Sequence, residues 1–316
     1  MINYDLVIIG GGASGLSAGI SALRNGIKNV LIIDRNNELG GNLNLFIHYG
    51  FGSYYLEKEV TGPELASQLI KDFKTLKGNF KINTEVLGIS KDKIISYVNP
   101  EEGVQEIKAS VVILASGCRE KFTGNINIPI HKYTGVFTLA AAHRIVNIQG
   151  FLPGKEVVVA GNNKWSLILA RRLILEGAKI KALLDTSDKG FSEEDLKFIK
   201  GFPMDIIKKS TVIELNGSDR LESIDIRDLR SGNVSTIECD SMILNVGYHP
   251  DMSYIRKLNI KIDSKSFPKV EEYETSEHGV FVCGTFLNGE DELLSSGESG
   301  YLCGEKAANY IKEYKY

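Results

Sequence analysis

The stretch DLVIIGGGASG, residues 5–15, decides the fold class of this chain. Its first half, Asp5 to Ile9, is a short apolar run typical of a buried strand, and it leads directly into a glycine-rich turn. Apolar residues then recur at helical spacing over residues 16–23, and a second buried apolar run follows at residues 30–33. The order strand, glycine turn, helix, strand predicts a βαβ unit.

The turn follows the pattern G-x-G-x-x-G, with Gly10, Gly12 and Gly15 at the three glycine positions. Gly10 allows the tight turn, Gly12 lets the backbone approach a pyrophosphate, and Gly15 lets the helix pack closely on the strand. The helix N-terminus offers N–H groups to phosphates, and Asp34, which ends the second strand, suits the hydroxyl groups of a ribose. The motif predicts a dinucleotide site without choosing between FAD and NAD.

A second βαβ unit is expected in the middle of the chain. Residues 156–160 are predicted to form a strand, GNNKWS at residues 161–166 a turn, and residues 167–176 a helix. A further strand over residues 178–184 ends at Asp185. Two such units predict an α/β chain with two nested Rossmann-like dinucleotide-binding domains, each a parallel sheet with helices plus a β-meander.

Short strand-like runs predict two meanders, one at residues 82–89, 94–97 and 106–109 and the other at 211–215, 221–228 and 235–239. A buried strand is expected after each meander, at residues 111–115 and 241–246. Because a last buried strand at 280–283 and a final helix at 297–311 follow, we expect the C-terminus to return to the first domain. The predicted domains are residues 1–118 with 247–316 for FAD, and residues 119–246 resembling a NAD(P)-binding domain.

The composition excludes several classes of function. The 316 residues carry a formal net charge of −3 without a basic cluster, which argues against a nucleic-acid surface. No apolar run is long enough to span a membrane and the N-terminal run lacks a basic flank, so we expect a soluble, cytoplasmic protein. The cysteines form no C-x-x-C pair, so neither a metal site nor a local dithiol is predicted, and Cys118 is the least inert of them.

Several further segments resemble the pyridine nucleotide–disulfide oxidoreductase superfamily. They are DR at residues 34–35, LGGN at 39–42, ASG at 115–117 and GVFVCG at 279–284. The resemblance implies the two-domain plan of thioredoxin reductase, although the C-x-x-C of that enzyme's second domain is absent. It also implies FAD in the first domain, bound by Gly10, Gly12, Ala13, Ser14, Gly15, Asp34, Arg35, Gly41, Asn42, Leu43, Val86, Ala115, Ser116, Gly117, Gly284, Thr285, Glu292 and Leu293.

Longer segments resemble one branch of this superfamily, the NAD(FAD)-dependent dehydrogenases. The branch includes subunits encoded with anaerobic glycerol-3-phosphate dehydrogenase, and relatives in sarcosine oxidase, opine and proline dehydrogenases, and hydrogen cyanide synthase. The resemblance is carried by GGNLNLFIHYGFG at residues 40–52, TGPE at 61–64, ASGCRE at 115–120, GVFT at 135–138, VNIQGFLPG at 146–154 and GYHP at 247–250.

The branch implies a flavin-dependent oxidoreductase that transfers hydride between NAD(H) and FAD. The alternative within the same branch is a FAD-carrying subunit of a heteromeric dehydrogenase whose NAD site is degenerate. The expected partners are therefore a small-molecule substrate or a second redox subunit, in an oligomer. A third interpretation is a scaffold that has kept the fold without turnover, and the intact first glycine motif argues against it.

The second nucleotide site departs from the family pattern. The residues expected there are Gly161, Asn162, Asn163, Lys164 and Asp185, and Asn163 stands where the family has the second glycine. Its side chain falls where a pyrophosphate would approach, whereas Asp185 still suits a ribose and disfavours the 2′-phosphate of NADPH. Three interpretations stay open: NADH binding that is weak or lost, a retained but altered site, and a site for a different adenine nucleotide.

Two further residues bear on the flavin. Thr285 follows Gly284 where the superfamily often has an aspartate that meets the flavin ribityl chain, so the resemblance implies an uncharged hydrogen bond there. His48 is the only histidine in a motif segment expected near the isoalloxazine ring. It is either a structural histidine or the one catalytic candidate, relaying a proton to the flavin or a substrate.

Overall fold

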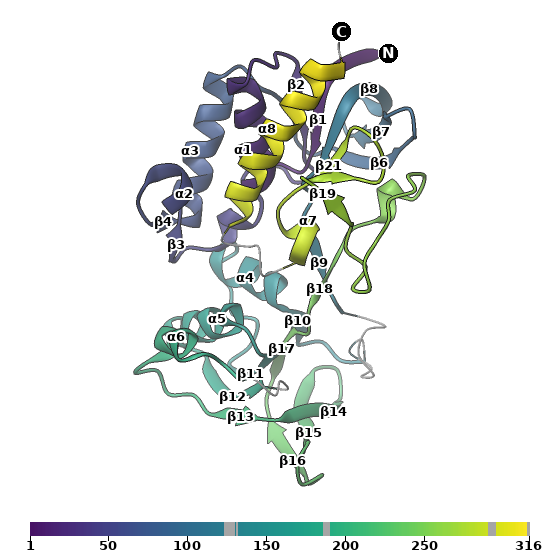
Figure 1. Cartoon of the computed structure of the whole chain (residues 1–316). Helices are drawn as coiled ribbons and strands as arrows, with labels where there is room; N and C mark the ends of the chain where they lie inside the picture. The colour runs from purple at the N-terminus through teal and green to yellow at the C-terminus, as the bar shows by residue number, and fades with distance from the viewer. Residues whose placement is uncertain (123–129, 131, 186–189, 290–294, 315–316) are drawn as a thin grey trace. The chain divides into compact units, whose positions relative to one another are not determined.

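The computed structural model describes residues 1–122, 130, 132–185, 190–289 and 295–314. The chain forms two compact units (Figure 1): unit 1 combines Met1–Arg119 with Tyr248–Tyr316, and unit 2 is Glu120–Gly247. Each division falls one residue beyond the domain boundary expected from the sequence. The two crossover segments, β9 (Cys118–Glu120) and β18 (Tyr248–Pro250), pair with each other.

Unit 1 is built on a nine-stranded sheet in which β1 pairs in parallel with β2 on one side and β8 on the other. Strands β5 and β21 extend the parallel part, while β6, β7, β19 and β20 add antiparallel pairs. The strands are β1 (Ile2–Ile9), β2 (Val30–Ile33), β5 (Asn79–Lys81), β6 (Glu85–Ile89), β7 (Ile94–Asn99), β8 (Gly103–Leu114), β19 (Val270–Glu271), β20 (Glu274–Thr275) and β21 (Val280–Val282).

Both faces of β1 and β2 are covered, which explains their unbroken apolar runs. On one face Val7 and Leu31 belong to a buried cluster that includes residues of the β6–β7 hairpin. On the other face Ile8 and Ile32 approach the glycines of helix α1 (Ala13–Arg24), and Phe73 of helix α3 (Gly62–Thr75) joins them there.

Helices α1 and α8 (Ser296–Tyr314) lie side by side in unit 1, as Figure 1 shows. Glycines permit this approach, because a Cβ at Gly300 would overlap the Ser14 carbonyl oxygen and one at Gly304 would overlap that of Ala18. The remaining elements of unit 1 are α2 (Ser53–Leu56), α7 (Thr285–Asn288), β3 (Tyr49–Phe51), β4 (Val60–Thr61), and 3₁₀ turns at Gly41–Leu45 and Ser253–Ile255.

The TGPE segment at residues 61–64 starts helix α3. Thr61 is the N-cap and accepts a hydrogen bond from the Glu64 N–H, while the Glu64 side chain accepts from the Thr61 N–H, and a proline occupies the first turn. This capping box satisfies two backbone donors at once. The motif therefore has a structural role, independent of any ligand.

Unit 2 repeats the plan with a five-stranded parallel sheet in the order β10-β17-β11-β12-β13, beside an antiparallel meander β14-β15-β16. The strands are β10 (Val136–Thr138), β11 (Glu156–Gly161), β12 (Lys179–Asp185), β13 (Ile206–Lys208), β14 (Ser210–Gly217), β15 (Leu221–Asp228), β16 (Val234–Glu238) and β17 (Ser241–Asn245). The helices are α4 (Leu139–Asn147), α5 (Lys164–Leu175) and α6 (Glu193–Leu196), with a 3₁₀ turn at Lys197–Ile199.

The predicted fold class, two Rossmann-like units each with a parallel sheet, helices and a meander, is confirmed. Details of the elements differ. The runs at 106–109 and 111–115 form one strand, β8, and the run at 82–89 becomes a strand only from Glu85. Strands β5 and β13 were not predicted, and α5 begins at Lys164, inside the expected turn, because Asn163 caps the helix there.

Candidate functional site

The glycine turn of unit 1 has the geometry that its sequence predicts. Gly10 has a φ of +108°, and a Cβ there would overlap the Ala115 carbonyl of the neighbouring strand. A Cβ at Gly15 would overlap the Gly10 carbonyl oxygen, so only glycine lets α1 start this close to β1. Gly12 is the N-cap of α1, and no described side chain caps this helix end. The turn therefore presents an open helix N-terminus.

Asp34 anchors the turn from the end of β2. Its Oδ2 accepts a 2.6 Å hydrogen bond from the Gly11 N–H, and its Oδ1 accepts bonds of 2.8 and 3.0 Å from the backbone and side-chain nitrogens of Asn36. The residue is only 5 % exposed. A carboxylate has about four acceptor sites, so these bonds leave capacity for a ribose hydroxyl.

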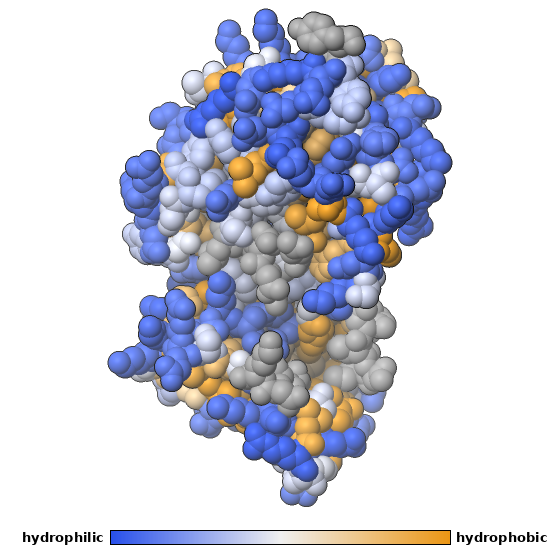
Figure 2. Space-filling view, in the orientation of Figure 1, coloured by the Kyte–Doolittle hydropathy of each residue, from blue (hydrophilic) through white to orange (hydrophobic). Residues whose placement is uncertain are grey.

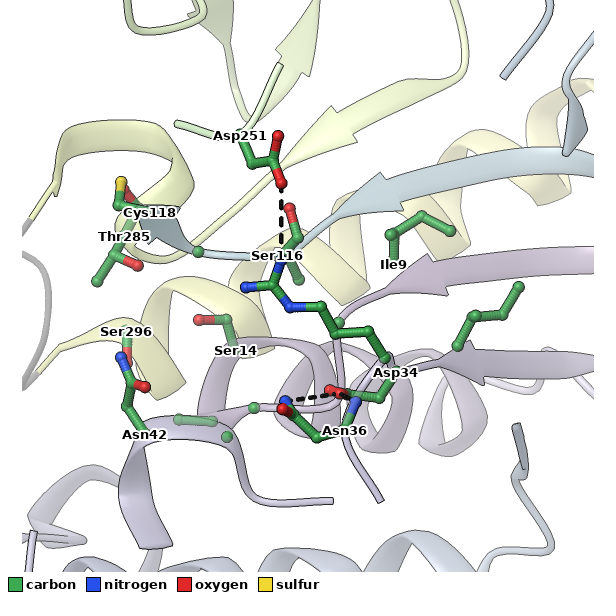
Figure 3. A pocket seen from close by; sticks show the side chains of 18 of the residues that line it. Ile9, Ser14, Asp34, Asn36, Asn42, Ser116, Cys118, Asp251, Thr285 and Ser296 are labelled. Carbon is green, nitrogen blue, oxygen red and sulfur yellow. Dashed lines mark hydrogen bonds and ion pairs between the residues drawn. The ribbon is translucent and has the colours of Figure 1, made fainter. Parts of the chain in front are cut away.

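These elements line one pocket, shown in Figure 3. Asp34 and Asn36 lie toward one end, Asn42, Thr285 and Ser296 toward the other, and Ser14 lies between them. The residues expected from the sequence that line it are Gly10, Gly12, Ala13, Ser14, Asp34, Arg35, Gly41, Asn42, Leu43, Val86, Ala115, Ser116, Gly117 and Thr285. Polar groups thus follow the length of the pocket, which suits an extended dinucleotide.

Two expected residues that the structure describes, Gly15 and Gly284, do not line this pocket. Gly15 lies beneath the turn, and Gly284 packs against the Ser14 side chain with a φ of +66°. Glu292 and Leu293 fall outside the residues that the structure describes. Gly284 still supports the site, because its N–H donates to the Ser299 hydroxyl at 3.1 Å and so joins the end of β21 to α8.

Asp251 is a pocket residue that the sequence reasoning missed. It is 8 % exposed and holds Arg119 through bonds of 2.6 and 2.7 Å, while Arg35 lies 3.7 Å away. Burial by itself raises the pKa of Asp251, but hydrogen bonds from Ser253 and Arg119 outweigh it and hold the pKa below its usual value. The only available signal was its position directly after GYHP at residues 247–250.

Tyr254 was also missed, and no sequence pattern marked it. Its hydroxyl lies 2.6 Å from that of Ser116, at the end of β8. Burial raises the pKa of Tyr254, so the phenol stays protonated and can hold the Ser116 hydroxyl in place. The other unpredicted lining residues are Ile9, Ile33, Asn36, Phe46, Phe51, Thr84, Glu85, Cys118 and Ser296.

Cys118 and Thr285 meet at the end of the pocket that also contains Ser296 (Figure 3). The Cys118 thiol donates to the Thr285 carbonyl oxygen at 2.7 Å, and both residues line the pocket. Ser296, the first residue of α8, lines it as well, so the start of this helix borders the same space. None of the four cysteines, all of them within the described part of the chain, forms a disulfide, and three of them are buried.

His48, the one catalytic candidate, does not line the pocket in the described part of the chain. Its ring packs against Phe46 and Phe51, with centroids 5.8 and 5.2 Å apart, and those two rings do line the pocket. Its Nδ1 lies 2.8 Å from the Tyr49 carbonyl oxygen. This position suits a structural histidine, and a proton relay through His48 stays a prediction.

The corresponding turn of unit 2 is arranged differently. Asn163 is the N-cap of α5, and its Oδ1 accepts hydrogen bonds from the N–H groups of Trp165 and Ser166 at 3.1 and 3.2 Å. Asp185, at the end of β12, is fully buried, and Lys164 stacks its ammonium over the Trp165 ring at 5.1 Å. The structure therefore places Asn162 and Asn163 between Gly161, the last residue of β11, and Lys164, the first residue of α5, and the Asn163 side chain is already bonded to the N-terminus of α5.

The described residues contain neither a metal-binding cluster nor a helix suited to cross a membrane. No group of three or more His, Cys, Asp or Glu side chains among them is arranged to hold a metal ion. None of the helices in these parts of the chain is long and apolar enough to cross a membrane. The visible face of unit 1 in Figure 2 is mostly hydrophilic, with apolar residues in small groups.

Two parallel-sheet units, one with a glycine-lined pocket at an open helix end, define an α/β protein of the dinucleotide-binding class. The chain belongs to the pyridine nucleotide-disulphide oxidoreductase family, whose profile matches residues 4–299. It is accordingly a flavin-dependent oxidoreductase, and FAD and NAD(P)H are the typical cofactors of the family.

Individual relatives are distant but similar over most of their length. The chain is 22 % identical to ferredoxin–NADP reductase 1 of Bacillus pumilus, over 98 % of this chain and 89 % of that protein. It is 24 % identical to a ferredoxin–NADP reductase of Streptococcus agalactiae, over 98 % and 94 % of the two chains.

Solved structures share the fold. The thioredoxin reductase of T. acidophilum superimposes with a TM-score of 0.82 at 22 % identity, over 99 % of both chains. The L-proline dehydrogenase of P. horikoshii gives a TM-score of 0.71 at 21 % identity, over 100 % of this chain and 56 % of that one. The two-domain plan expected from the sequence is therefore shared with thioredoxin reductase.

Proposed function

We propose that the protein holds FAD in unit 1 and transfers hydride between NAD(H) and FAD, as a member of the NAD(FAD)-dependent dehydrogenase branch. The observation that carries the proposal is the pocket in which the uncapped end of α1, the Gly10 turn and Asp34 meet. An open helix N-terminus attracts phosphate, and a buried carboxylate at the second strand suits a ribose. The residues present therefore fit FAD.

Each side of the pocket has a separate task in this proposal. The first turn of α1 binds the pyrophosphate, and Asp34 orients the adenosine ribose. Ser116, held by Tyr254, and Thr285, held by Cys118, supply hydrogen bonds farther along the pocket. Bound FAD supplies the hydride chemistry, and the protein contributes binding, orientation and exclusion of water.

Exchange with a pyridine nucleotide is assigned to unit 2. The β11–α5–β12 arrangement has the plan of a dinucleotide site, and Asp185 ends β12 where a ribose acceptor is expected. The ferredoxin–NADP reductases among the relatives carry NADP in their names. Asp185 favours NADH over NADPH in this chain, because its charge repels a 2′-phosphate.

Anaerobic absorbance titration of the FAD-loaded protein tests the proposal. We expect NADH to bleach the flavin band and NADPH to do so at higher concentration. Dithionite serves as the control, because it reduces any accessible flavin without a nucleotide site. A flavin that dithionite bleaches and that NADH leaves oxidised at every concentration would remove NAD(H) from the proposal.

A second candidate function is a FAD-carrying subunit of a heteromeric dehydrogenase. It is favoured by the Asn163 side chain, which bonds to the end of α5 where a pyrophosphate would bind. A second redox subunit would then exchange electrons with the flavin. Affinity purification from the native source, followed by size-exclusion chromatography, tests this candidate, and a protein that elutes only with itself contradicts it.

A further inference from the structure

The two glycine-motif turns of this chain occupy equivalent places, but the N-termini of the helices that follow them are capped in different ways. Gly12, the second motif position of unit 1, is an N-cap without a capping side chain. Asn163, the second motif position of unit 2, is also an N-cap, and its side chain caps the helix. A dinucleotide pyrophosphate uses the first-turn N–H groups of such a helix. The N-terminus of α5 therefore already has a side-chain acceptor, whereas the N-terminus of α1 is open.

The Asn163 carboxamide takes the contacts that a phosphate oxygen would take. Its Oδ1 accepts from the N–H groups of Trp165 and Ser166 and lies 3.4 Å from the Ser166 hydroxyl. Ser166 stands at the third motif position, where unit 1 has Gly15. Since each N–H group has one hydrogen to donate, a pyrophosphate gains these two donors only if the Asn163 side chain leaves them.

Asn245 holds Asn163 in this position. It lies at the end of β17, directly beside Gly161 in the parallel register, and is only 6 % exposed. Its Nδ2 donates to Asn163 Oδ1 at 2.7 Å and to the Ser166 hydroxyl at 3.0 Å. The orientation of both amides follows from this, because the Asn163 atom that accepts from two N–H groups must be oxygen and its partner must be nitrogen. The side chain is thus fixed by a residue from a distant part of the chain.

We propose that Asn163, positioned by Asn245, is an internal competitor of the nucleotide pyrophosphate and sets the affinity of unit 2 for dinucleotides. This inference rests on the proposed function, in that it takes unit 2 as the nucleotide unit. It names the residue that restricts that unit. The competition is reversible, because a rotation of one side chain frees both N–H groups without unfolding the turn.

Binding of ADP-ribose to the full-length, FAD-loaded protein tests the inference. ADP-ribose contains the pyrophosphate and cannot reduce the flavin, so the readout is independent of activity. Calorimetry gives Kd, and the emission of Trp165, the single tryptophan of the chain, reports a change at the α5 end. We expect N163G to lower Kd about tenfold, equivalent to about 1.4 kcal/mol, because glycine is tolerated at an N-cap and frees both donors.

Two further variants serve as controls. N163D keeps the cap, since aspartate caps as well as asparagine, and adds a negative charge that repels the pyrophosphate, so its Kd should rise above that of the wild type. T61G removes the cap of α3 in unit 1 and should leave Kd unchanged, which separates the local effect from general destabilisation.

Equal, tight binding by the wild type and N163G would overturn the inference and leave the proposed function standing. If neither protein binds ADP-ribose, both the inference and the proposed function are overturned, because freeing the two N–H groups would then have created no nucleotide site. Tighter binding by N163G together with weaker binding by N163D supports the inference.

Discussion

Replacing Asp34 by alanine tests how the FAD pocket is held together. The substitution leaves the buried Gly11 N–H without its acceptor, since Asp34 Oδ2 accepts it at 2.6 Å. A buried donor left without a partner costs about 1–3 kcal/mol. Loss of the two bonds from Asn36 adds to this, although water can replace them because that residue is partly exposed. We expect D34A to destabilise unit 1 by about 3 kcal/mol.

The assay is thermal unfolding of the protein with and without FAD. A loss of this size lowers Tm by roughly 6–12 °C, at about 2–4 °C per kcal/mol for a unit of this size. Without FAD, the difference in Tm between D34A and the wild type depends only on the bonds of Asp34 to Gly11 and Asn36. With FAD bound, the difference also includes the contact between Asp34 and the ribose. We therefore expect a larger drop with FAD, and a rise in the Kd of FAD of at least about tenfold, since a hydrogen bond to a charged group contributes about 1.5–3 kcal/mol.

N36A is the matched control, because it removes one of these bonds and leaves the bond between Gly11 and Asp34 intact. Its effect on Tm should be less than a third of that of D34A. Two results would refute the reasoning. An unchanged Tm in FAD-free D34A would show that the Gly11 bond contributes nothing, and an unchanged Kd would show that the ribose does not bind at Asp34.

Two other predictions concern packing and pH. G304A should lower Tm, because the new Cβ overlaps the Ala18 carbonyl oxygen and overpacking costs about 1–3 kcal/mol. Glu305, the next residue, is exposed, so the control variant E305A should change the free energy of unfolding by no more than about 0.5 kcal/mol. Burial raises the pKa of Glu120 although it accepts a bond from the Ala140 N–H, so its ionisation costs stability as pH rises through the ordinary value of about 4.3. E120Q should therefore melt higher than wild type at neutral pH, with the difference shrinking below about pH 4.3. Calorimetry across this pH range checks the sign, and a constant difference would contradict it.

The glycine turn and Asp34 of the proposed FAD pocket could be predicted because their requirements are local. Gly10 and Gly15 are demanded by backbone contacts between one strand and the helix that follows it, and Asp34 ends the next strand. Residues this close in the chain meet in any βαβ unit, so their spacing alone is informative. The same holds for the two-unit plan, which follows from the repetition of this pattern.

Asp251 and Tyr254 could not be predicted as pocket residues, because only folding brings their segment to the pocket. Both follow the return crossover, and Tyr254 meets Ser116, which follows β8 far earlier in the chain. No periodicity links them, so their contacts leave no local pattern. His48 shows the reverse case: its motif segment suggested a ligand contact, whereas its ring packs against Phe46 and Phe51.

The amino-acid sequence by itself determined the class of fold, and it predicted the position of a first dinucleotide site and the alteration of a second one. These depend on glycines, apolar periodicity and a terminal acid that act over one βαβ unit. The tertiary structure decided the orientation of the Asn163 side chain. Its Oδ1 accepts hydrogen bonds both from the N-terminus of α5 and from Asn245, which ends β17, the strand next to β11 in the sheet. A side-chain orientation set by partners this far apart in sequence is a property of the folded unit, because the chain order does not encode their distance.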